Sequence, residues 1–539
     1  MPDYDVIVIG SGAGGLAAAV PIAQGGKSVL VLEQHEIPGG WSQTFTLNGY
    51  RFSPGVHYIG ELGEGGWLRK VYEGLGVSQD LIFFELNPQG FDHIFLGNER
   101  FDIPKGKEAQ IAYLQKRFPH EAQGIRDYFE AVDGLMANLK KLGSANSVSK
   151  ALKAAPGIIS VLRWHKKTGK DLLDAYLSDR KLKGVLSAQA GDHGLPPSMA
   201  SVFMQAGIAR HYFHGGFYPR GGGGAIPKAF VRALKRAGGE LRLQTPVARI
   251  LLEEKRAVGV ELANGETITA GTIISNADPE VTFGKLIGRE HLPAKLRTKL
   301  DGLSYSTSCI SLFFAVDMDL EAAGLDSGNY WFFEDENVDD LYRQGLTDAV
   351  LKRETLGEFF LTVTTLKDRT KMHNGHHTLE MFTFVSYDAF EKWAQSRPEQ
   401  RPDAYEAMKE ELTERMFQAL EKRIPGISKH VVFQSLSTPL TNEFFINATR
   451  GSLYGTAKTP EQVGPGGFNT TTPFEGLLLC GASTFSHGIS GVTATGLAAA
   501  RQVLGVRTSE LLSQNGPRLP VYPADDPSVW PESLRKRLR

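Results

Sequence analysis

The chain has 539 residues, of which 41% are hydrophobic and 22% charged, so it is long enough to bury more than one globular core. Its 59 Lys and Arg residues balance 60 Asp and Glu residues, and a net charge of -1 creates no field that would attract nucleic acid. We therefore expect no nucleic-acid partner. The two cysteines, Cys309 and Cys480, lie far apart and predict reduced thiols rather than a disulfide.

Targeting segments are not predicted. The first predicted strand, residues 5–9, is not preceded by the basic and then apolar stretch of a signal peptide. Apolar runs such as residues 310–316 are far shorter than the roughly 20 residues of a spanning helix. We expect no transmembrane segment and, by default, a cytoplasmic location.

The first forty residues predict half of a doubly wound parallel sheet. A strand at 5–9 is followed by a glycine-rich turn at 10–15, a helix at 16–24 and a strand at 28–33. This order of elements is typical of a dinucleotide-binding unit.

Two later blocks extend this sheet. Residues 225–275 predict a helix at 225–237, and the pair Asn264-Gly265 predicts a hairpin-like turn between strands. Residues 476–504 predict a strand at 477–480 and a helix from Val492. The strands expected in the first of these blocks cover residues 247–253, 257–262 and 272–275.

The predicted fold class is α/β, with a discontinuous Rossmann-type dinucleotide-binding domain and an inserted α+β substrate-binding domain. The Rossmann-type domain is expected to comprise residues 1–91, 218–279 and 440–510. The insertions, 92–217 and 280–439, mix helical patterns with alternating strands such as 308–316 and 378–385. Residues 511–539 are expected to form a C-terminal tail, and the five prolines from Pro517 onwards predict that it is extended or poorly ordered.

The glycine-rich turn carries the pattern G-x-G-x-x-G at Gly10, Gly12 and Gly15. The first glycine allows a tight turn, the second lets the backbone approach a pyrophosphate, and the third lets helix and strand pack closely. Phosphates would lie against the free N–H groups at the start of the helix. Glu33 ends the next strand, where it can accept hydrogen bonds from ribose hydroxyls and would repel a 2′-phosphate. The alternative is a glycine-rich turn that only connects strand and helix.

The third block favours FAD over NAD. Its strand ends at Gly481, and a helix with Gly491 and Val492 near its start follows. Such an arrangement can support a ribityl chain and direct N–H groups toward the edge of the flavin that becomes negative on reduction.

Several segments also resemble the superfamily of carotenoid desaturases, carotenoid isomerases and retinol saturases. They include residues 5–33 and 38–40, the Gly-Val-His-Tyr-Ile-Gly stretch at 55–60, residues 211–222 and 274–279, and residues 476–496. The stretch at 55–60 is most similar to the retinol saturase and carotenoid isomerase branch. The resemblance spans most of the chain, although the insertions match only loosely.

The resemblance implies a set of FAD contacts, with the backbone of Val247 at the adenine. Family members often have an Arg at the position of Trp41 and an acid at the position of Ala482. In this chain Ser42 or Ser483 would then make the phosphate and ribityl contacts of those residues. The expected cofactor-binding residues are Gly10, Gly12, Ala13, Gly14, Gly15, Glu33, Gln34, Gly40, Trp41, Ser42, Gly55, Val247, Gly481, Ala482, Gly491 and Val492.

Three residues are candidates for chemistry beside the flavin. The family resemblance would place His57 and Tyr58 near the isoalloxazine, where a histidine could donate a proton to carbon or stabilise an anionic flavin. Arg210 precedes His211 and Tyr212 in a polar and aromatic cluster that could line the end of a substrate tunnel. The alternatives are a packed, hydrogen-bonded histidine and an ordinary arginine at a domain junction.

A metal site is not predicted. His373, His376 and His377 flank the pair Asn374-Gly375, which is a hairpin-turn signal rather than a ligand pattern.

Residues 134–170 predict contact with a membrane surface. The segment contains no Asp or Glu but eight Lys and Arg residues. Apolar residues at helical spacing between these cations are typical of amphipathic helices lying in a membrane interface. The alternative is a solvated helical lid on the substrate domain.

Together these features predict an FAD-dependent oxidoreductase that is peripherally associated with a membrane. Its expected partner is a lipophilic small molecule, an isoprenoid polyene of the carotenoid or retinoid class, that is desaturated, saturated or isomerised. Two alternatives stay open: an enzyme like the flavin amine oxidases, although no lysine or aromatic cage near the flavin can be singled out, and a non-catalytic, flavin-bound lipid carrier. The oligomeric state is not predicted.

Overall fold

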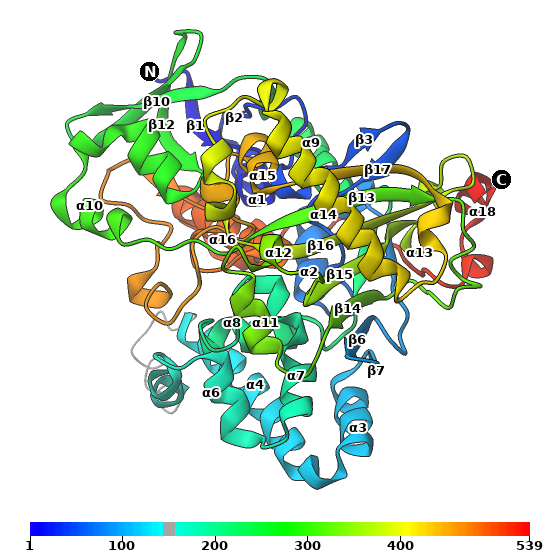
Figure 1. Ribbon diagram of the computed structural model, residues 1–539. Coiled ribbons are helices and arrows are strands. Elements are labelled where there is room, and N and C mark those ends of the chain that lie inside the picture. The colour runs from blue at the N-terminus through cyan, green and yellow to red at the C-terminus, as the bar shows by residue number, and fades with distance from the viewer. Residues whose placement is uncertain (144–156, 539) are drawn as a thin grey trace.

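The computed structural model describes residues 1–143 and 157–538. Two seven-stranded sheets organise the chain, and most of its helices cover their faces (Figure 1). The predicted strands at 247–253 and 308–316 form with the expected bounds.

The first sheet is the predicted dinucleotide-binding sheet. Its centre is parallel, with β1 (Tyr4–Ile9) between β2 (Val29–Leu32) and β12 (Thr267–Ser275). The strand order is β10-β11-β12-β1-β2-β9, and β18 pairs in parallel with β12. The hairpin predicted at Asn264-Gly265 is confirmed, because β11 and β12 pair antiparallel on either side of it. The other strands are β9 (Glu240–Arg242), β10 (Val247–Glu253), β11 (Arg256–Leu262) and β18 (Leu477–Leu479).

Three helices pack together on one side of this sheet. α1 (Ala13–Gln24) is buried along almost its whole length between α16 (Gly488–Leu504) and α9 (Ala225–Arg236). Small residues allow the close approach: a Cβ on Gly496 would lie 2.2 Å from the carbonyl oxygen of Gly14. α16 begins at Gly488, four residues before the predicted start at Val492.

The second sheet is antiparallel except for the β6–β14 pair, in the order β17-β13-β16-β15-β14-β6-β7. Alternate side chains enter different cores: Cys309 and Phe382 face one, whereas Ile310 and Met381 face the other. Both faces of the sheet are therefore covered. Its strands are β6 (Asp92–Leu96), β7 (Glu99–Ile103), β13 (Ser308–Val316), β14 (Asn329–Phe333), β15 (Glu358–Val363), β16 (His377–Val385) and β17 (Val431–Ser437).

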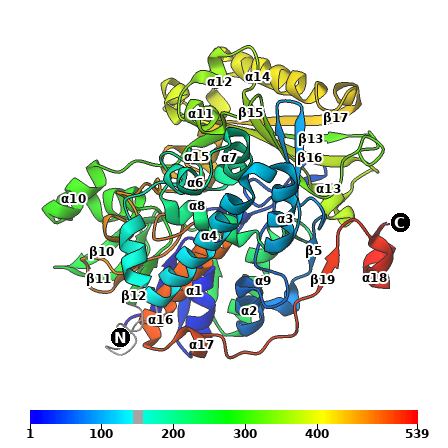
Figure 2. The ribbon, with the colours of Figure 1, turned by 90° about the horizontal axis from the view of Figure 1, so that it is seen from below.

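Helices from different parts of the sequence cover the two faces. The face of Phe382 is covered by α3 (Lys107–Arg117), α4 (Ala122–Gly143) and their neighbours, and the opposite face by α14 (Asp403–Glu421) (Figure 2). The neighbours are α6 (Gly169–Tyr176), α7 (Arg180–Ser187), α8 (Val202–His211) and α11 (Val338–Gln344).

The shorter elements connect these layers. Residues 157–164 are also helical. The remaining strands and α-helices are β3 (Phe45–Leu47), β4 (Tyr50–Phe52), α2 (Trp67–Gly74), β5 (Phe83–Glu85), β8 (Phe217–Pro219), α10 (Ala294–Asp301), α12 (Ala349–Lys352), α13 (Thr364–Lys367), α15 (Pro439–Ile446), α17 (Thr508–Leu511), β19 (Val521–Pro523) and α18 (Glu532–Arg535).

Both sheets draw on separated parts of the chain, as the predicted domains do. Residues 281–300, which the prediction places in the substrate domain, pack instead in the core of the first sheet. The division into domains at the expected boundaries otherwise stays a prediction.

The C-terminal tail packs against the body. Its described residues include the extended strand β19, so the expectation of an extended segment holds there, whereas the expectation of poor order is wrong. β19 pairs in parallel with β5, and Trp530 is only 2% exposed, with its ring 4.5 Å from that of Phe84. The last helix, α18, lies near α13, the short helix that follows strand β15 of the second sheet (Figure 1). The prolines limit regular structure, but buried Trp530 and Leu534 hold the segment in place.

Candidate active site

A single cavity extends from the glycine-rich loop of the first sheet to the face of the second sheet. Its far wall includes Cys309, Ser311, Phe360 and Phe382. Most of the predicted site residues line this cavity: Gly10, Gly12, Ala13, Gly14, Glu33, Gln34, Gly40, Trp41, Ser42, Gly55, His57, Val247, Gly481, Ala482 and Val492.

The glycine-rich loop has the backbone geometry that the motif requires. Gly10 has a φ of +91°, and a Cβ on Gly15 would lie 2.2 Å from the carbonyl oxygen of Gly10. Gly15 therefore serves helix–strand packing and does not line the cavity. A Cβ on Gly12 would lie 2.6 Å from Nδ2 of Asn276, so this glycine makes room for a neighbouring side chain. Asn276 itself lines the cavity, and motif reasoning did not assign it a role.

Glu33 is fixed at the cavity wall by short hydrogen bonds. Its Oε2 accepts from the hydroxyl of Ser11 at 2.6 Å and from the Ser11 backbone N–H at 2.9 Å. Its Oε1 accepts from the backbone N–H of His35 at 3.0 Å. A carboxylate held in this way can still accept from the hydroxyls of a ribose, and it disfavours a phosphate at the same place.

The start of α16 forms the wall opposite the loop. His487 precedes this helix, lines the cavity and is 5% exposed, and neither of its ring nitrogens has a hydrogen-bond partner within the described chain. Burial lowers the pKa of His487 well below its usual value, so the ring is neutral. Gly491 does not line the cavity but packs against Ser486, where a Cβ would lie 2.4 Å from Oγ. Unpaired polar atoms facing the cavity fit a bound polar cofactor.

His57 lies where the two sheets meet. Its Nδ1–H donates to Oε2 of Glu380 at 3.0 Å, and Glu380 also accepts from the backbone N–H of Ser53 at 2.7 Å. The ring lies 5.2 Å from Phe360 and 5.4 Å from Phe382. The Glu380 side chain is 2% exposed, so the pair is held away from bulk water. Glu380 follows His57 by more than 300 residues, and no local motif could have connected them.

Tyr58 lies behind the cavity wall. Its hydroxyl lies 2.7 Å from Oδ2 of Asp192 and 3.2 Å from Oδ2 of Asp92, and its ring stacks on Tyr212 with a centroid distance of 4.3 Å. Asp192 lines the cavity, whereas Tyr58 does not. Tyr58 therefore reaches the cavity through Asp192, a residue that sequence reasoning missed.

The structure does not bring Arg210 to the cavity, which corrects the prediction of a catalytic or tunnel-lining role. Its side chain is 46% exposed at the end of α8, and its Nε lies 3.2 Å from Asp133. Burial falls along α8, from the mostly buried residues Val202 to Ala206 at its start to its last turn, and Arg210 lies at that exposed end.

Three buried lysines were also missed. Lys367 donates to the backbone oxygen of His57 at 2.7 Å and also to Asn329. Lys371 donates to the hydroxyl of Tyr218 at 3.0 Å, and Lys458 to that of Thr456 at 3.1 Å. Burial lowers the pKa of Lys367 and of Lys458 to about 7. None of the three lines the cavity, and no lysine within residues 1–143 and 157–538 lies directly on its wall.

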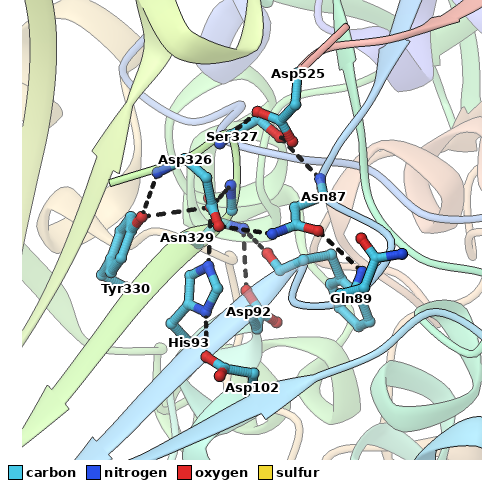
Figure 3. A network of polar contacts seen from close by, with 12 residues as sticks. Asn87, Gln89, Asp92, His93, Asp102, Asp326, Ser327, Asn329, Tyr330 and Asp525 are labelled. Atoms are coloured by element: carbon cyan, nitrogen blue, oxygen red, sulfur yellow. Dashed lines mark hydrogen bonds and ion pairs between the residues drawn. The ribbon is translucent and has the colours of Figure 1, made fainter. Parts of the chain in front are cut away.

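A polar network behind the site connects the second sheet to the C-terminal tail (Figure 3). Nδ1 of His93 lies 2.5 Å from Asp102, and its Nε2 lies 2.9 Å from Asp326. Asp525 of the tail holds the hydroxyl and backbone N–H of Ser327 at 2.7 and 3.1 Å. The network explains how a segment rich in proline remains fixed.

No group of three or more His, Cys, Asp or Glu residues in the described chain is arranged to hold a metal ion. His373 and His376 bridge across the turn at Asn374, as the hairpin prediction requires.

The helices within residues 1–143 and 157–538 include none with the length and apolar character to cross a membrane.

Comparison with known proteins identifies the family. Residues 13–504 match the model of the family described as flavin containing amine oxidoreductase, and this match covers most of the chain. The chain therefore belongs to this family and is a flavin-dependent oxidoreductase.

Two relatives place the chain more closely. All-trans-retinol 13,14-reductase of Danio rerio is 31% identical over 482 residues, which cover 84% of this chain and 77% of the relative. The chloroplastic prolycopene isomerase of Arabidopsis thaliana is 30% identical over 517 residues, which cover 93% of this chain and 82% of the relative. The resemblance to the retinol saturase and carotenoid isomerase branch is confirmed.

Solved structures confirm the fold class. An oxidoreductase from Methanosarcina mazei superposes with a TM-score of 0.60 at 18% identity, covering 92% of this chain and 99% of the other. At this identity the similarity shows the fold alone, an α/β architecture with a Rossmann-type dinucleotide-binding sheet.

Proposed function

We propose that the chain is an FAD-dependent oxidoreductase that acts on a C–C or C=C bond of a hydrophobic isoprenoid polyene of the retinoid or carotenoid class. The observation that carries the proposal is the single cavity, which joins a dinucleotide loop at one end to the rings of Phe360 and Phe382 at the other. The two relatives act, by their names, on retinol and on prolycopene.

The proposed FAD contacts are the predicted residues that line the cavity. The N–H groups at the start of α1 suit the pyrophosphate, Glu33 suits the adenosine ribose, and the start of α16 suits the flavin half. His487, with its two unpartnered nitrogens, and Asn276 are added to this set.

The far part of the cavity suits an apolar substrate. Phe360 and Phe382 stack at 4.7 Å, and Leu453 and Tyr454 continue the wall. Such a surface gains stability when it buries a polyene and excludes water from the reacting carbons. FAD, when bound, supplies hydride transfer to or from carbon.

His57 is proposed to act at the centre of this cavity. Glu380 fixes the ring orientation through Nδ1, which leaves Nε2 available to exchange a proton or to stabilise negative charge on the cofactor. Burial of Glu380 keeps this arrangement ordered.

The protein is also proposed to associate peripherally with a membrane on its cytoplasmic side. Part of the predicted basic segment, residues 144–156, lies outside the described residues. In the described part, the side chains of Ile159 and Leu162 are 70% and 58% exposed next to Arg163, although Val161 on the same helix is buried. Exposed apolar groups beside cations suit a lipid interface.

The test is anaerobic titration of the flavin absorbance with all-trans-retinol, its saturated derivative and a carotenoid. An enzyme of the proposed kind is reduced or reoxidised by one of them, whereas a lipid carrier changes in neither direction and an amine oxidase responds only to amines. Gly12→Val should yield colourless protein, because its side chain displaces Asn276 or the pyrophosphate. Full FAD content in that variant would contradict the proposed site.

A further inference from the structure

An acid on the cavity wall has no role in the mechanism described above. Asp192 lies in the short helical turn Ala188–His193 and lines the same cavity as His57 and Tyr454. Its Oδ2 lies 2.7 Å from the hydroxyl oxygen of Tyr58. Behind Tyr58 lies a second acid, Asp92, which is fully buried in β6.

The positions of Tyr58, Asp92 and Asp192 require that one of the two carboxyl groups carries a proton. The hydroxyl oxygen of Tyr58 lies within hydrogen-bond distance of both carboxyl groups, but a hydroxyl has only one hydrogen to donate. Both contacts are hydrogen bonds only if one of the two acids is protonated and donates to Tyr58. The two acids therefore share one proton through the phenol.

The neighbours of Asp92 show which acid holds that proton. Gln189 donates to Oδ2 of Asp92 at 2.7 Å. Asn329 donates to Oδ1 of the same carboxyl group at 3.0 Å (Figure 3). These amide donors suit an ionised carboxylate. Asp92 is thus the anion that accepts from Tyr58, and Asp192 is the acid that donates to it.

The groups around Asp192 support this assignment. Tyr58, Tyr212, Tyr342 and Tyr454 all interact with its charge, and Asp92 and Lys367 are the charged groups that face it. Burial and, to a smaller extent, the negative charge of Asp92 raise the pKa of Asp192 to about 8, although hydrogen bonds from Tyr58 and Tyr212 and the charge of Lys367 oppose the rise. Burial raises the pKa of Asp92 only to about 6, because four neighbours stabilise its anion. At neutral pH the proton is therefore on Asp192.

We propose that Asp192 is the general acid of the reaction on the polyene, and that the chain works in the direction of saturation. The inference rests on the proposed function. FAD, when bound and reduced, would supply a hydride with its electron pair to one carbon of the C=C bond, and Asp192 gives its proton to the neighbouring carbon. The π bond is replaced by two C–H bonds, and the Asp192 carboxylate that remains accepts a hydrogen bond from Tyr58. Solvent returns the proton after product leaves.

The arrangement explains why saturation is favoured. A desaturase needs a base to remove a proton from carbon, and a carboxyl group that is already protonated cannot serve in that role. A buried acid that keeps its proton at neutral pH is suited to deliver it to a carbon that takes up a hydride.

The first experiment detects the proton itself, in the flavin-loaded protein without substrate. We expect the infrared difference spectrum between wild type and Asp192→Asn to show the C=O stretch of a protonated carboxyl at neutral pH. That band should disappear as the pH rises through about 8. Tyr58→Phe removes the shared hydroxyl and should shift the band and its midpoint. No carboxyl band assignable to Asp192 at neutral pH would overturn the inference.

The second experiment measures the anaerobic reoxidation of the reduced flavin by all-trans-retinol. Asp192→Asn, which keeps the size of the side chain, should slow this reoxidation about 10²- to 10⁴-fold. Flavin content and the Kd for retinol should stay at their wild-type values, and the wild-type slowing in D2O should vanish. A wild-type rate in the variant overturns the inference about Asp192 but leaves the proposed function standing. If neither retinol nor a carotenoid reoxidises the wild-type flavin but one of the tested compounds reduces it, the inferred direction is wrong and the proposed function stands. If the flavin changes in neither direction with any of them, the proposed function is wrong, and the inference falls with it.

Discussion

The two seven-stranded sheets differ in how far apart in sequence their site residues lie. In the first sheet, the loop at 10–15 and Glu33 come from one strand–helix–strand unit. In the second, His57 meets Glu380 across 323 residues, and Tyr58 meets Asp192 across 134. The first kind of site consists of local backbone geometry and leaves a motif. The second consists of single side chains from loops, a helical turn and a strand that tertiary packing brings together, and it leaves none.

The largest expected effect is in the first sheet, where backbone approaches backbone. Gly15→Ala would place its Cβ 2.2 Å from the Gly10 carbonyl oxygen, and that oxygen cannot yield without breaking the loop. We expect loss of bound flavin and of most soluble protein. Gly134→Ala is the matched control, because that helical glycine has open space around it and the change should be neutral or stabilise by up to about 1 kcal/mol. Wild-type flavin content in Gly15→Ala would contradict the assignment.

The next effect tests the junction of the two sheets. His57→Ala should keep fold and flavin but lower turnover per bound flavin by about 10²- to 10⁴-fold. Glu380→Gln should act in the same direction but more weakly, because it loosens the ring without removing it. Glu358→Gln changes another buried acid of the second sheet that does not line the cavity, and it should change stability rather than turnover. Unchanged turnover per flavin in His57→Ala would remove His57 from the mechanism.

A smaller effect concerns pH and the network behind the second sheet. Burial opposes the charge of His93, but hydrogen bonds to Asp102 and Asp326 outweigh it and raise the pKa of His93. The native state therefore binds the proton of His93 more tightly than the unfolded state does. The contribution of this proton to the free energy of unfolding is complete below the unfolded pKa of about 6.5. It is lost as the pH rises through the raised folded pKa.

Urea denaturation from about pH 6 to about pH 9 measures this contribution. His93→Gln should flatten the decline and cost about 1.5 to 3 kcal/mol at the acid end, the value of a hydrogen bond to a charged group. His291→Gln, at an exposed side chain, is the control and should follow wild type. If the free energy of unfolding of His93→Gln falls with rising pH as much as that of wild type, groups other than His93 cause the decline.

The smallest expected effect is at the surface, outside both sheets. Ile159→Asn with Leu162→Asn should weaken binding to anionic vesicles by about tenfold, because partial burial of each apolar side chain is worth about 0.7 kcal/mol and the pair therefore about 1.4 kcal/mol. Val529→Asn changes an apolar side chain of similar exposure on the C-terminal tail and should leave binding unchanged. Lys166→Glu with Lys167→Glu should reduce the salt dependence. Sedimentation with vesicles is the measurement, and equal binding by all variants would locate the membrane contact elsewhere.

Much of the fold was predictable because its signals are local. Alternation gave the bounds of β10 and β13, and Asn264-Gly265 gave the hairpin between β11 and β12. The order of the C-terminal tail was predicted incorrectly, because prolines are a local signal. The pocket that buries Trp530 is formed by residues distant in sequence, such as Phe84.

The sequence by itself determined the dinucleotide loop, Glu33 and the family, because strand, turn and helix must follow one another along the chain for that site to form. Only the tertiary structure decided which acids and rings surround the reacting part of the cavity. In the folded chain Arg210 is exposed to solvent, His57 is hydrogen-bonded to Glu380, and Asp192 is hydrogen-bonded to Tyr58. The physical reason is that a buried proton or charge takes its properties from its neighbours in space, and the pairing of distant strands and helices selects those neighbours.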